Sequence, residues 1–197
     1  MAPACAPCST PNTIARGKSS GESVDNNYIA VILFFAPAGI ANAAPVLANR
    51  IPVWNRWKTP LDFGKSWRGK RITGDNKTWR GLISGIILGG ISAVLISKLV
   101  PETIVNDIVF ATGALLGAGA LVGDAIESIV KRQRGIAPGT KWFPWDQVDY
   151  IIGGLLFVLP VAHLPQWAIL TIVIAYFPLH LLFACIGYLL GLKSTPI

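Results

Sequence analysis

The chain has 197 residues, of which 52% are hydrophobic and only 14% charged, and its formal net charge is +7. Soluble domains carry about 25% charged residues, so the composition of the whole chain rules out an ordinary soluble domain, a coiled coil and a chain that is disordered throughout. It favours a polytopic membrane protein. A nucleic-acid-binding protein is disfavoured, because such proteins spread their cations over a polar surface that this chain lacks.

Residues 1–27 precede the first apolar run and are rich in Pro, Ser and Ala. We expect a disordered, extracytoplasmic tail. Its Cys5 and Cys8 do not predict a zinc site, because zinc needs four ligands and the third cysteine, Cys185, lies in an apolar run near the C-terminus. The tail is therefore expected to be passive, and an extracytoplasmic disulfide is the alternative.

Long runs without Asp, Glu, Lys or Arg predict five membrane-spanning helices, since one crossing needs about 20 apolar residues. The last run, Tyr150–Leu192, is too long for one crossing and is interrupted at Pro165, which favours a turn between two helices. Cleavage by a signal peptidase after Ala43 would leave four spans, but the leader lacks the positive charge of a signal peptide. The prediction is an all-α fold with one transmembrane domain over 28–197, with spans near 28–48, 80–100, 103–128, 147–164 and 166–191.

The cations predict how the helices are oriented. Five spans place the two long connections, 49–80 and 129–147, on the same side as the C-terminus. That side holds all but three of the 17 Lys and Arg residues, and the exceptions are Arg16, Lys18 and Lys98. By the positive-inside rule, the N-terminus is outside, and the two large loops and the C-terminus of this multi-pass cell-membrane protein are cytoplasmic.

Glycines recur at helical spacing in the second and third predicted spans. Small residues four apart let helices approach closely, so we expect tight packing of these two spans. A glycine-lined groove for a lipid chain is the alternative. The glycines are Gly81, Gly85 and Gly89 in the second span, and Gly113, Gly117, Gly119 and Gly123 in the third.

Asp124, Glu127, Ser128 and Lys131 are spaced to share one face at the cytoplasmic end of the third span. An ion-pair ladder would explain them structurally. However, Asp124 directly follows a charge-free run, and Lys131-Arg132 adds more charge than pairing requires. Unpaired charges in the bilayer cost on the order of 3 kcal/mol, so we favour a functional site at this face.

Two more carboxylates begin the fourth predicted span. Asp146 and Asp149 are three residues apart and share a face. Acids at a helix N-terminus next to interfacial aromatic residues have a structural explanation, because the helix dipole favours them there. Together with Asp124 they also offer the oxygen ligands that Mg²⁺ prefers, and we expect a magnesium site formed by these three residues.

The loop before the second span carries a run of cations from Lys65 to Arg80, interleaved with glycines and hydroxyl side chains. Gly64 and Gly69 resemble the glycines of a P-loop, but Arg71 stands where Ser or Thr is required, so we reject that motif. Glycines let backbone amides approach an anion, and Lys and Arg neutralise phosphate. We expect a triphosphate pocket here, and a patch for lipid headgroups is the alternative.

Four segments in order, all on the predicted cytoplasmic side, resemble the archaeal CDP-archaeol synthases, relatives of the phosphatidate cytidylyltransferases. The resemblance runs from about residue 28 to 192 and excludes the tail. Bacterial and eukaryotic relatives usually carry an Asp-Arg-x-Asp type segment where this chain has Asp146-Gln147-Val148-Asp149. The segments are Asp62-Phe63-Gly64, Arg71–Gly81, Gly123-Asp124 with Ser128 and Lys131-Arg132, and Asp146-Gln147-Val148-Asp149.

The resemblance implies Mg²⁺-dependent transfer of a cytidylyl group from CTP to an isoprenoid ether lipid phosphate within the membrane, giving CDP-archaeol and pyrophosphate. Asp124, Asp146 and Asp149 are then expected to hold Mg²⁺ and, with Lys131, to act in catalysis. His180 is expected to be structural. The expected substrate-binding residues are Lys65, Lys70, Arg71, Thr73, Asp75, Asn76, Lys77, Thr78, Arg80, Glu127, Ser128 and Arg132.

Two other functions compete with this interpretation. A CDP-alcohol phosphotransferase-like enzyme would consume the CDP-lipid, but the run of aspartates that opens with Asp-Gly-x-x-Ala-Arg has no counterpart in this sequence. A small anion or nucleotide transporter would place its substrate near the bilayer midplane between inverted repeats. Here the charged residues gather on one predicted side, which favours the transferase.

Overall fold

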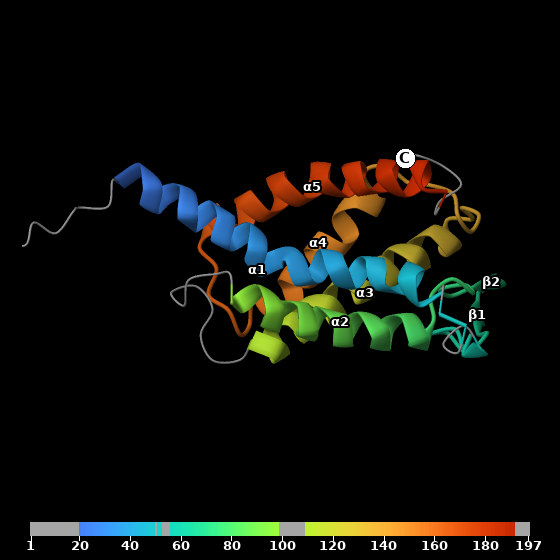
Figure 1. Cartoon of the computed structure of the whole chain (residues 1–197). Coiled ribbons are helices and arrows are strands. Elements are labelled where there is room, and N and C mark those ends of the chain that lie inside the picture. The colour runs from blue at the N-terminus through green and yellow to red at the C-terminus, as the bar shows by residue number, and fades with distance from the viewer. Residues whose placement is uncertain (1–19, 50, 53–55, 99–108, 192–197) are drawn as a thin grey trace, which may run out of the picture.

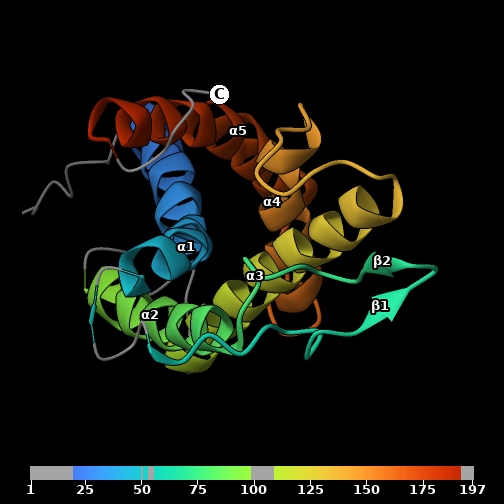
Figure 2. The same ribbon diagram turned by 90° about the vertical axis from the view of Figure 1, so that its right-hand side faces the viewer.

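The computed structural model describes residues 20–49, 51–52, 56–98 and 109–191, which form five helices and one short β-hairpin (Figure 1). The all-α prediction is confirmed for the bundle, and the hairpin is an addition that the sequence did not predict. Viewed from the hairpin end, α1, α3, α4 and α5 are arranged in a ring, and α2 packs against α1 and α3 (Figure 2). The helices are α1 Ser20–Ala48, α2 Trp79–Ser97, α3 Val109–Gln133, α4 Trp145–Val158 and α5 Gln166–Leu189.

Four of the helices, α1 from Asn27 onward, α2, α3 and α5, are long and apolar enough to cross a bilayer. Helix α4 has 14 residues, which is about 21 Å at 1.5 Å per residue and shorter than the roughly 30 Å hydrocarbon core. It ends at Val158, before the predicted limit at residue 164, because Pro160 has no N–H to donate to the next helical hydrogen bond. A fifth crossing and the orientation of the bundle therefore stay predictions.

Other boundaries also differ from the predicted ones. Helix α1 begins at Ser20, inside the predicted tail 1–27, and α3 continues through its charged end to Gln133. The part of the tail that contains Cys5 and Cys8 lies outside the described residues. A charge-free run locates the apolar part of a helix but not its polar ends. The polar first turns of α1 therefore fell within the predicted tail.

The core lies where α1, α3, α4 and α5 meet, around Phe35, Leu116 and Ile151, whose side chains are at most 1% exposed. Two tyrosines connect three of these helices through backbone carbonyls. The Tyr150 hydroxyl donates to the Tyr176 carbonyl at 3.1 Å, and the Tyr176 hydroxyl donates to the carbonyl of Ile32 at 2.6 Å. These bonds fix α4 to α5 and α5 to α1.

Glycines bring α3 into backbone contact with two neighbours. On α2, a Cβ added to Gly89 would lie 2.6 Å from the Gly113 carbonyl oxygen, so the predicted close packing of the second and third spans is confirmed. Gly119 and Gly123 instead face α4: added Cβ atoms there would lie 2.3 Å from the Gly153 oxygen and 2.2 Å from the Asp149 oxygen. No other residue fits at such distances, so these glycines fix the separation of α3 and α4.

The hairpin joins β1 (Ser66–Trp67) to β2 (Lys70–Arg71) in antiparallel register. Its two turn residues, Arg68 and Gly69, have φ angles of 54° and 74°. A type I′ turn requires positive φ at both of its central residues, and Gly69 adopts this conformation without strain. The hairpin lies at the same end of the bundle as the start of α2 and the end of α3 (Figure 1).

Candidate active site

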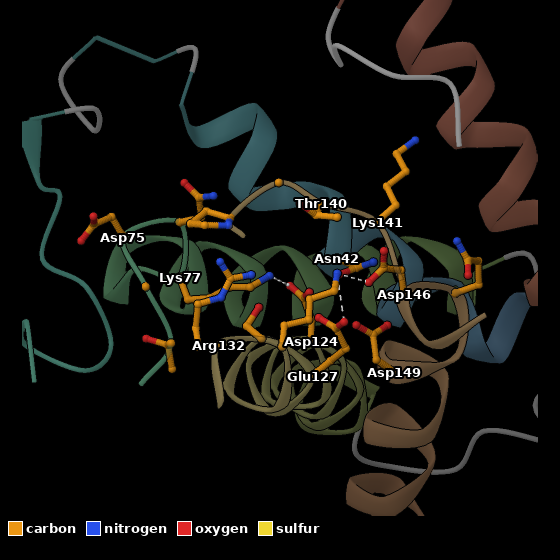
Figure 3. Close-up of a pocket in the computed structure, with 18 of the residues that line it drawn as sticks. Asn42, Asp75, Lys77, Asp124, Glu127, Arg132, Thr140, Lys141, Asp146 and Asp149 are labelled. Atoms are coloured by element: carbon orange, nitrogen blue, oxygen red, sulfur yellow. Dashed lines mark hydrogen bonds and ion pairs between the residues drawn. The ribbon is translucent and has the colours of Figure 1, made fainter. Parts of the chain in front are cut away.

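A cavity of about 310 Å³ opens at the hairpin end of the bundle, bounded by α1, α3, α4, α5 and the two loops that precede α2 and α4 (Figure 3). We call it the polar pocket. The loops contribute small, polar and charged residues, among them Asp75, and the helices contribute the other carboxylates. Its lining residues are Asn42, Thr73, Gly74, Asp75, Asn76, Lys77, Asp124, Glu127, Ser128, Lys131, Arg132, Pro138, Gly139, Thr140, Lys141, Asp146, Gln147, Asp149, His180 and Ala184.

Three carboxylates form the floor of the polar pocket. One oxygen from each of Asp124, Glu127 and Asp149 lies within 4.8 Å of the other two. Asp124 and Glu127 share a face of α3, as their spacing predicted, and Asp149 reaches them from α4 across the glycine contact at Gly123. Close packing of the two helices is therefore what brings the third carboxylate to the other two.

Two lysines pair with two of these three carboxylates, Asp124 and Glu127. The Lys77 ammonium group, from the loop before α2, pairs with Asp124. The Lys131 ammonium group lies 2.9 Å from Glu127 and also pairs with Asp146, and both members of the Lys131–Glu127 pair are nearly buried. Such compensation is needed because burying a carboxylate without a partner costs several kcal/mol.

The three-carboxylate cluster fits a magnesium ion. Mg²⁺ binds oxygens at about 2.0–2.1 Å, so two ligands of one ion lie at most roughly 4.2 Å apart. Carboxylate oxygens within 4.8 Å need only a small side-chain shift to meet that limit. Asp146, which the sequence also placed at the metal, accepts a hydrogen bond from the Trp142 amide at 2.8 Å and pairs with Lys131. Its metal role stays a prediction, and Glu127 stands nearer to the other two acids.

Asp62 organises the loop that covers one side of the polar pocket. Its buried carboxylate accepts hydrogen bonds from the backbone amides of Gly64, Thr73 and Gly74 at 2.9 to 3.1 Å, and Arg71 donates to both of its oxygens. Burial acts to raise the pKa of Asp62, but the hydrogen bonds from Arg71 and the three amides outweigh it and hold the pKa well below its usual range. The Asp62 carboxylate is therefore ionised, and it holds the loop together through these hydrogen bonds.

The structure separates the predicted substrate-binding residues into two groups. Seven line the polar pocket: Thr73, Asp75, Asn76, Lys77, Glu127, Ser128 and Arg132. The others are engaged elsewhere or lie outside it. Arg71 pairs with Asp62 and Asp75, Lys70 donates to the Gln133 carbonyl at 2.8 Å, Thr78 caps α2, Arg80 is buried and donates to Asn49, and Lys65 is exposed.

Sequence reasoning missed five polar residues of the pocket wall: Asn42, Thr140, Lys141, Gln147 and His180. Asn42 and His180 stand alone in apolar helices, where a single polar residue gives little signal. Gln147 lies between two aspartates that drew attention first. Its position next to Asp146, a candidate metal ligand at the start of a span, is the sequence signal that could have identified it.

An apolar groove runs between α3 and α4 next to the polar pocket, with a volume of about 430 Å³. Several of its walls face outward: Ile126, Ile152 and Leu156 are 55%, 49% and 64% exposed. The groove and the polar pocket share Glu127 and Asp149. A molecule with an anionic head and an apolar chain would therefore span both.

Comparisons with known proteins show the family to which the chain belongs. The CarS-like family, described as CDP-archaeol synthase, matches residues 25–197. A CDP-archaeol synthase of Pyrococcus furiosus is 35% identical over 83% of this chain and 94% of its own length, and one of Methanopyrus kandleri is 37% identical over 83% and 90%. A solved structure of an intramembrane enzyme for archaeal membrane lipids biosynthesis superposes with a TM-score of 0.65 at 30% identity, covering 77% of this chain and 90% of that one.

Proposed function

Because the chain belongs to the CDP-archaeol synthase family, it is a multi-pass membrane enzyme that transfers a cytidylyl group from CTP in archaeal lipid synthesis, and we propose that the polar pocket is its active site. One observation carries this assignment. The carboxylate cluster of Asp124, Glu127 and Asp149 lies where a cation-lined pocket meets an outward-facing apolar groove. A nucleotide and a lipid phosphate can meet there.

The reaction joins two anions. An oxygen of the lipid phosphate attacks the α-phosphorus of CTP, the bond from that phosphorus to the β-phosphate oxygen breaks, and pyrophosphate leaves with the electron pair. A phosphate monoester is largely dianionic at neutral pH, so the attacking oxygen needs no strong general base. What the pocket must supply is neutralisation of charge and alignment of the two phosphates.

Asp124, Glu127 and Asp149 would hold Mg²⁺ in this site, since their oxygens are the ligands that it prefers. When bound, Mg²⁺ would neutralise charge on the triphosphate and on the leaving pyrophosphate. Lys77 and Lys131, which pair with these carboxylates in the structure, are then able to pair with phosphate oxygens. Each lysine would keep a partner throughout, so neither carboxylate nor ammonium is left buried alone.

The lipid substrate is proposed to be an isoprenoid ether lipid phosphate. Its phosphate would enter the polar pocket beside Arg132, while a chain lies in the groove along Val122, Ile126 and Leu156. A lipid chain in the bilayer is already out of water, so the groove provides van der Waals packing and shape rather than a hydrophobic driving force. Because exposed residues form the walls, the chain can enter from the bilayer without passing through water.

We further propose that the bundle crosses the cell membrane five times and that the polar pocket faces the cytoplasm, where CTP is made. The support is the concentration of Lys and Arg on the two loops that border the pocket. Labelling of single cysteines at the exposed positions Lys65 and His163 by an impermeant thiol reagent in intact cells tests the orientation. Only the His163→Cys site is expected to react.

The assay for the function uses purified protein in detergent with CTP, Mg²⁺ and a geranylgeranyl diether glycerol phosphate, and it measures CDP-lipid and pyrophosphate together. Equal amounts of both products are expected, with none when Mg²⁺ is replaced by EDTA. Pyrophosphate without CDP-lipid would indicate plain CTP hydrolysis. Absence of both products with either an archaeal or a diacyl lipid phosphate would contradict the proposal.

A further inference from the structure

Gln147 is a buried polar residue that the chemistry above does not use. It lies in the first turn of α4, is only 4% exposed and lines the polar pocket. Its side-chain oxygen Oε1 has no hydrogen-bond partner among the described residues. A buried acceptor without a partner costs roughly 1–3 kcal/mol, so its retention in the wall of a pocket points to a partner on a bound molecule.

Gln147 Oε1 is a hydrogen-bond acceptor, so its partner on a bound molecule must be an N–H or O–H donor. Phosphate oxygens, ether oxygens and pyrophosphate are acceptors too, and a diether glycerol phosphate that is ionised has no N–H or O–H group to offer. CTP is the one substrate of the proposed reaction that carries donors, namely the 4-amino group of cytosine and the two ribose hydroxyls. The Gln147 oxygen is therefore matched to the nucleoside part of CTP and not to either phosphate or to the lipid.

The neighbouring wall agrees with a nucleoside. Asn42 from α1 is a second neutral polar residue of the same pocket, whereas the cations Lys77, Lys131 and Arg132 come from the loop and from α3. Neutral groups cannot offset the charge of a triphosphate, but they can hydrogen-bond to a base. An amide also presents an acceptor beside a donor, which complements the 4-amino group and the N3 atom at the edge of cytosine.

We propose that Gln147 is the base-recognition residue of this enzyme, and that its side-chain oxygen accepts a hydrogen bond from the 4-amino group of cytosine. The proposal rests on the CTP-dependent function proposed above. Uracil carries a carbonyl oxygen at the same position, so Oε1 would face a second acceptor there. A site that leaves a buried polar group unpaired with the wrong ligand discriminates strongly against it.

The test removes the amino group from the nucleotide and the amide from the protein, singly and together. Wild-type enzyme and the isosteric variant Gln147→Met are assayed for CDP-lipid formation with CTP and with the 2-pyrimidinone riboside triphosphate, which lacks only the 4-amino group. We expect the wild-type kcat/KM to fall roughly tenfold to hundredfold with the analogue. In Gln147→Met the fall should shrink to less than about threefold, because the hydrogen bond is already absent.

Further arms separate the alternatives. Gln147→Glu keeps an acceptor and should retain the preference for CTP over the analogue. A preference for CTP over dCTP that disappears in Gln147→Met would assign the contact to the ribose and overturn the proposal. An unchanged analogue penalty in Gln147→Met would overturn it as well. Equilibrium binding of both nucleotides provides the same comparison for a variant too slow to assay, and Gln147→Leu, which also lacks the acceptor, replaces Gln147→Met if that variant does not fold.

Two controls keep a structural effect apart from a recognition effect. Ser92→Ala removes a buried hydroxyl of α2 that donates to the Gly89 carbonyl of its own helix, and it should leave the CTP-to-analogue ratio unchanged. Thermal unfolding of each variant reports its fold. Wild-type protein that forms no CDP-lipid with any nucleotide would contradict the proposed function itself, whereas active protein with an unaltered ratio in Gln147→Met contradicts only the role of Gln147.

Discussion

The two halves of α3 differ in their contacts although they belong to one continuous helix: the first half packs against neighbouring helices, and the second lines the polar pocket. From Val109 to Gly123 the helix presents glycines and small residues that touch the backbones of α2 and α4. From Asp124 to Gln133 it carries four charged residues of the polar pocket, Asp124, Glu127, Lys131 and Arg132. Because the first half sets the distance between α3 and α4, it determines whether Asp149 reaches the acids of the second half. Changes in the two halves should therefore separate stability from chemistry.

The largest loss of activity is expected from the charged half. Asp124→Asn keeps the size of the side chain but removes the charge that faces Lys77 and the proposed Mg²⁺. CDP-lipid formation should fall by at least about a hundredfold, a typical cost of removing one stabilising group from an active site. The thermal unfolding temperature should stay near that of wild type. Activity within tenfold of wild type would exclude Asp124 from the catalytic group.

The packing half should lose stability and activity together. An alanine Cβ at Gly123 would lie 2.2 Å from the Asp149 carbonyl oxygen, a contact that forces α3 and α4 apart. Overpacking of this kind costs typically 1–3 kcal/mol, so Gly123→Ala should lower the unfolding temperature measured in detergent and the activity.

The matched control for that prediction is Gly39→Ala in α1. The nearest atom to an added Cβ there is Cε1 of Tyr176 at 3.6 Å, which is ordinary contact. Alanine is also the better helix former, so this variant should be as stable as wild type or slightly more so. Equal destabilisation by both changes would show that the contact between α3 and α4 is not special.

A smaller effect is expected from the loop cation that reaches the charged half. Lys77→Met should raise the KM for CTP about tenfold, because a charge-assisted contact to phosphate is lost. Lys65→Met changes an exposed lysine of the same loop that lies outside the polar pocket and should stay within about twofold of wild type. Equal effects of the two changes would indicate that the loop acts through its overall charge.

The arrangement of the helices follows from the sequence to a large extent. Charge-free runs locate all five, and helical spacing correctly places Asp124, Glu127 and Lys131 on one face. Lengths are less well predicted, since the pattern of apolar residues continues past Val158 although α4 ends there. The hairpin was missed because two-residue strands leave no periodic pattern.

The loop shows what sequence reasoning cannot resolve. A run of cations predicts an anion site, yet Lys70, Arg71 and Arg80 have partners within the protein itself. Which cation reaches a ligand depends on the path of the backbone, and that path depends on Asp62. Glu127 lies beside Asp149 because α3 and α4 pack closely, and residue spacing along one helix does not reveal a contact between two helices.

The smallest expected effect comes from changing Asp62, which determines the backbone path of the loop before α2. Asp62→Asn removes the charge that Arg71 and three amides share, and it should raise the KM for CTP severalfold with little change in the unfolding temperature. Because the pKa of Asp62 is depressed in the folded loop, its contribution is present above the ordinary value of 3.8 and is lost as the pH falls further below it. Limited proteolysis of wild-type protein should therefore cut the loop faster at pH about 3 than at pH about 6, whereas Asp62→Asn should show no such change.

The most direct test of the carboxylate cluster is binding of Mn²⁺, as a spectroscopic substitute for Mg²⁺, measured by electron paramagnetic resonance in purified protein with CTP. Wild-type protein is expected to bind the ion tightly only when CTP is present, and Asp124→Asn and Asp149→Asn should each lose that binding. Equal Mn²⁺ affinity in wild type and both variants would show that the cluster holds no metal, and the proposed active site would be wrong.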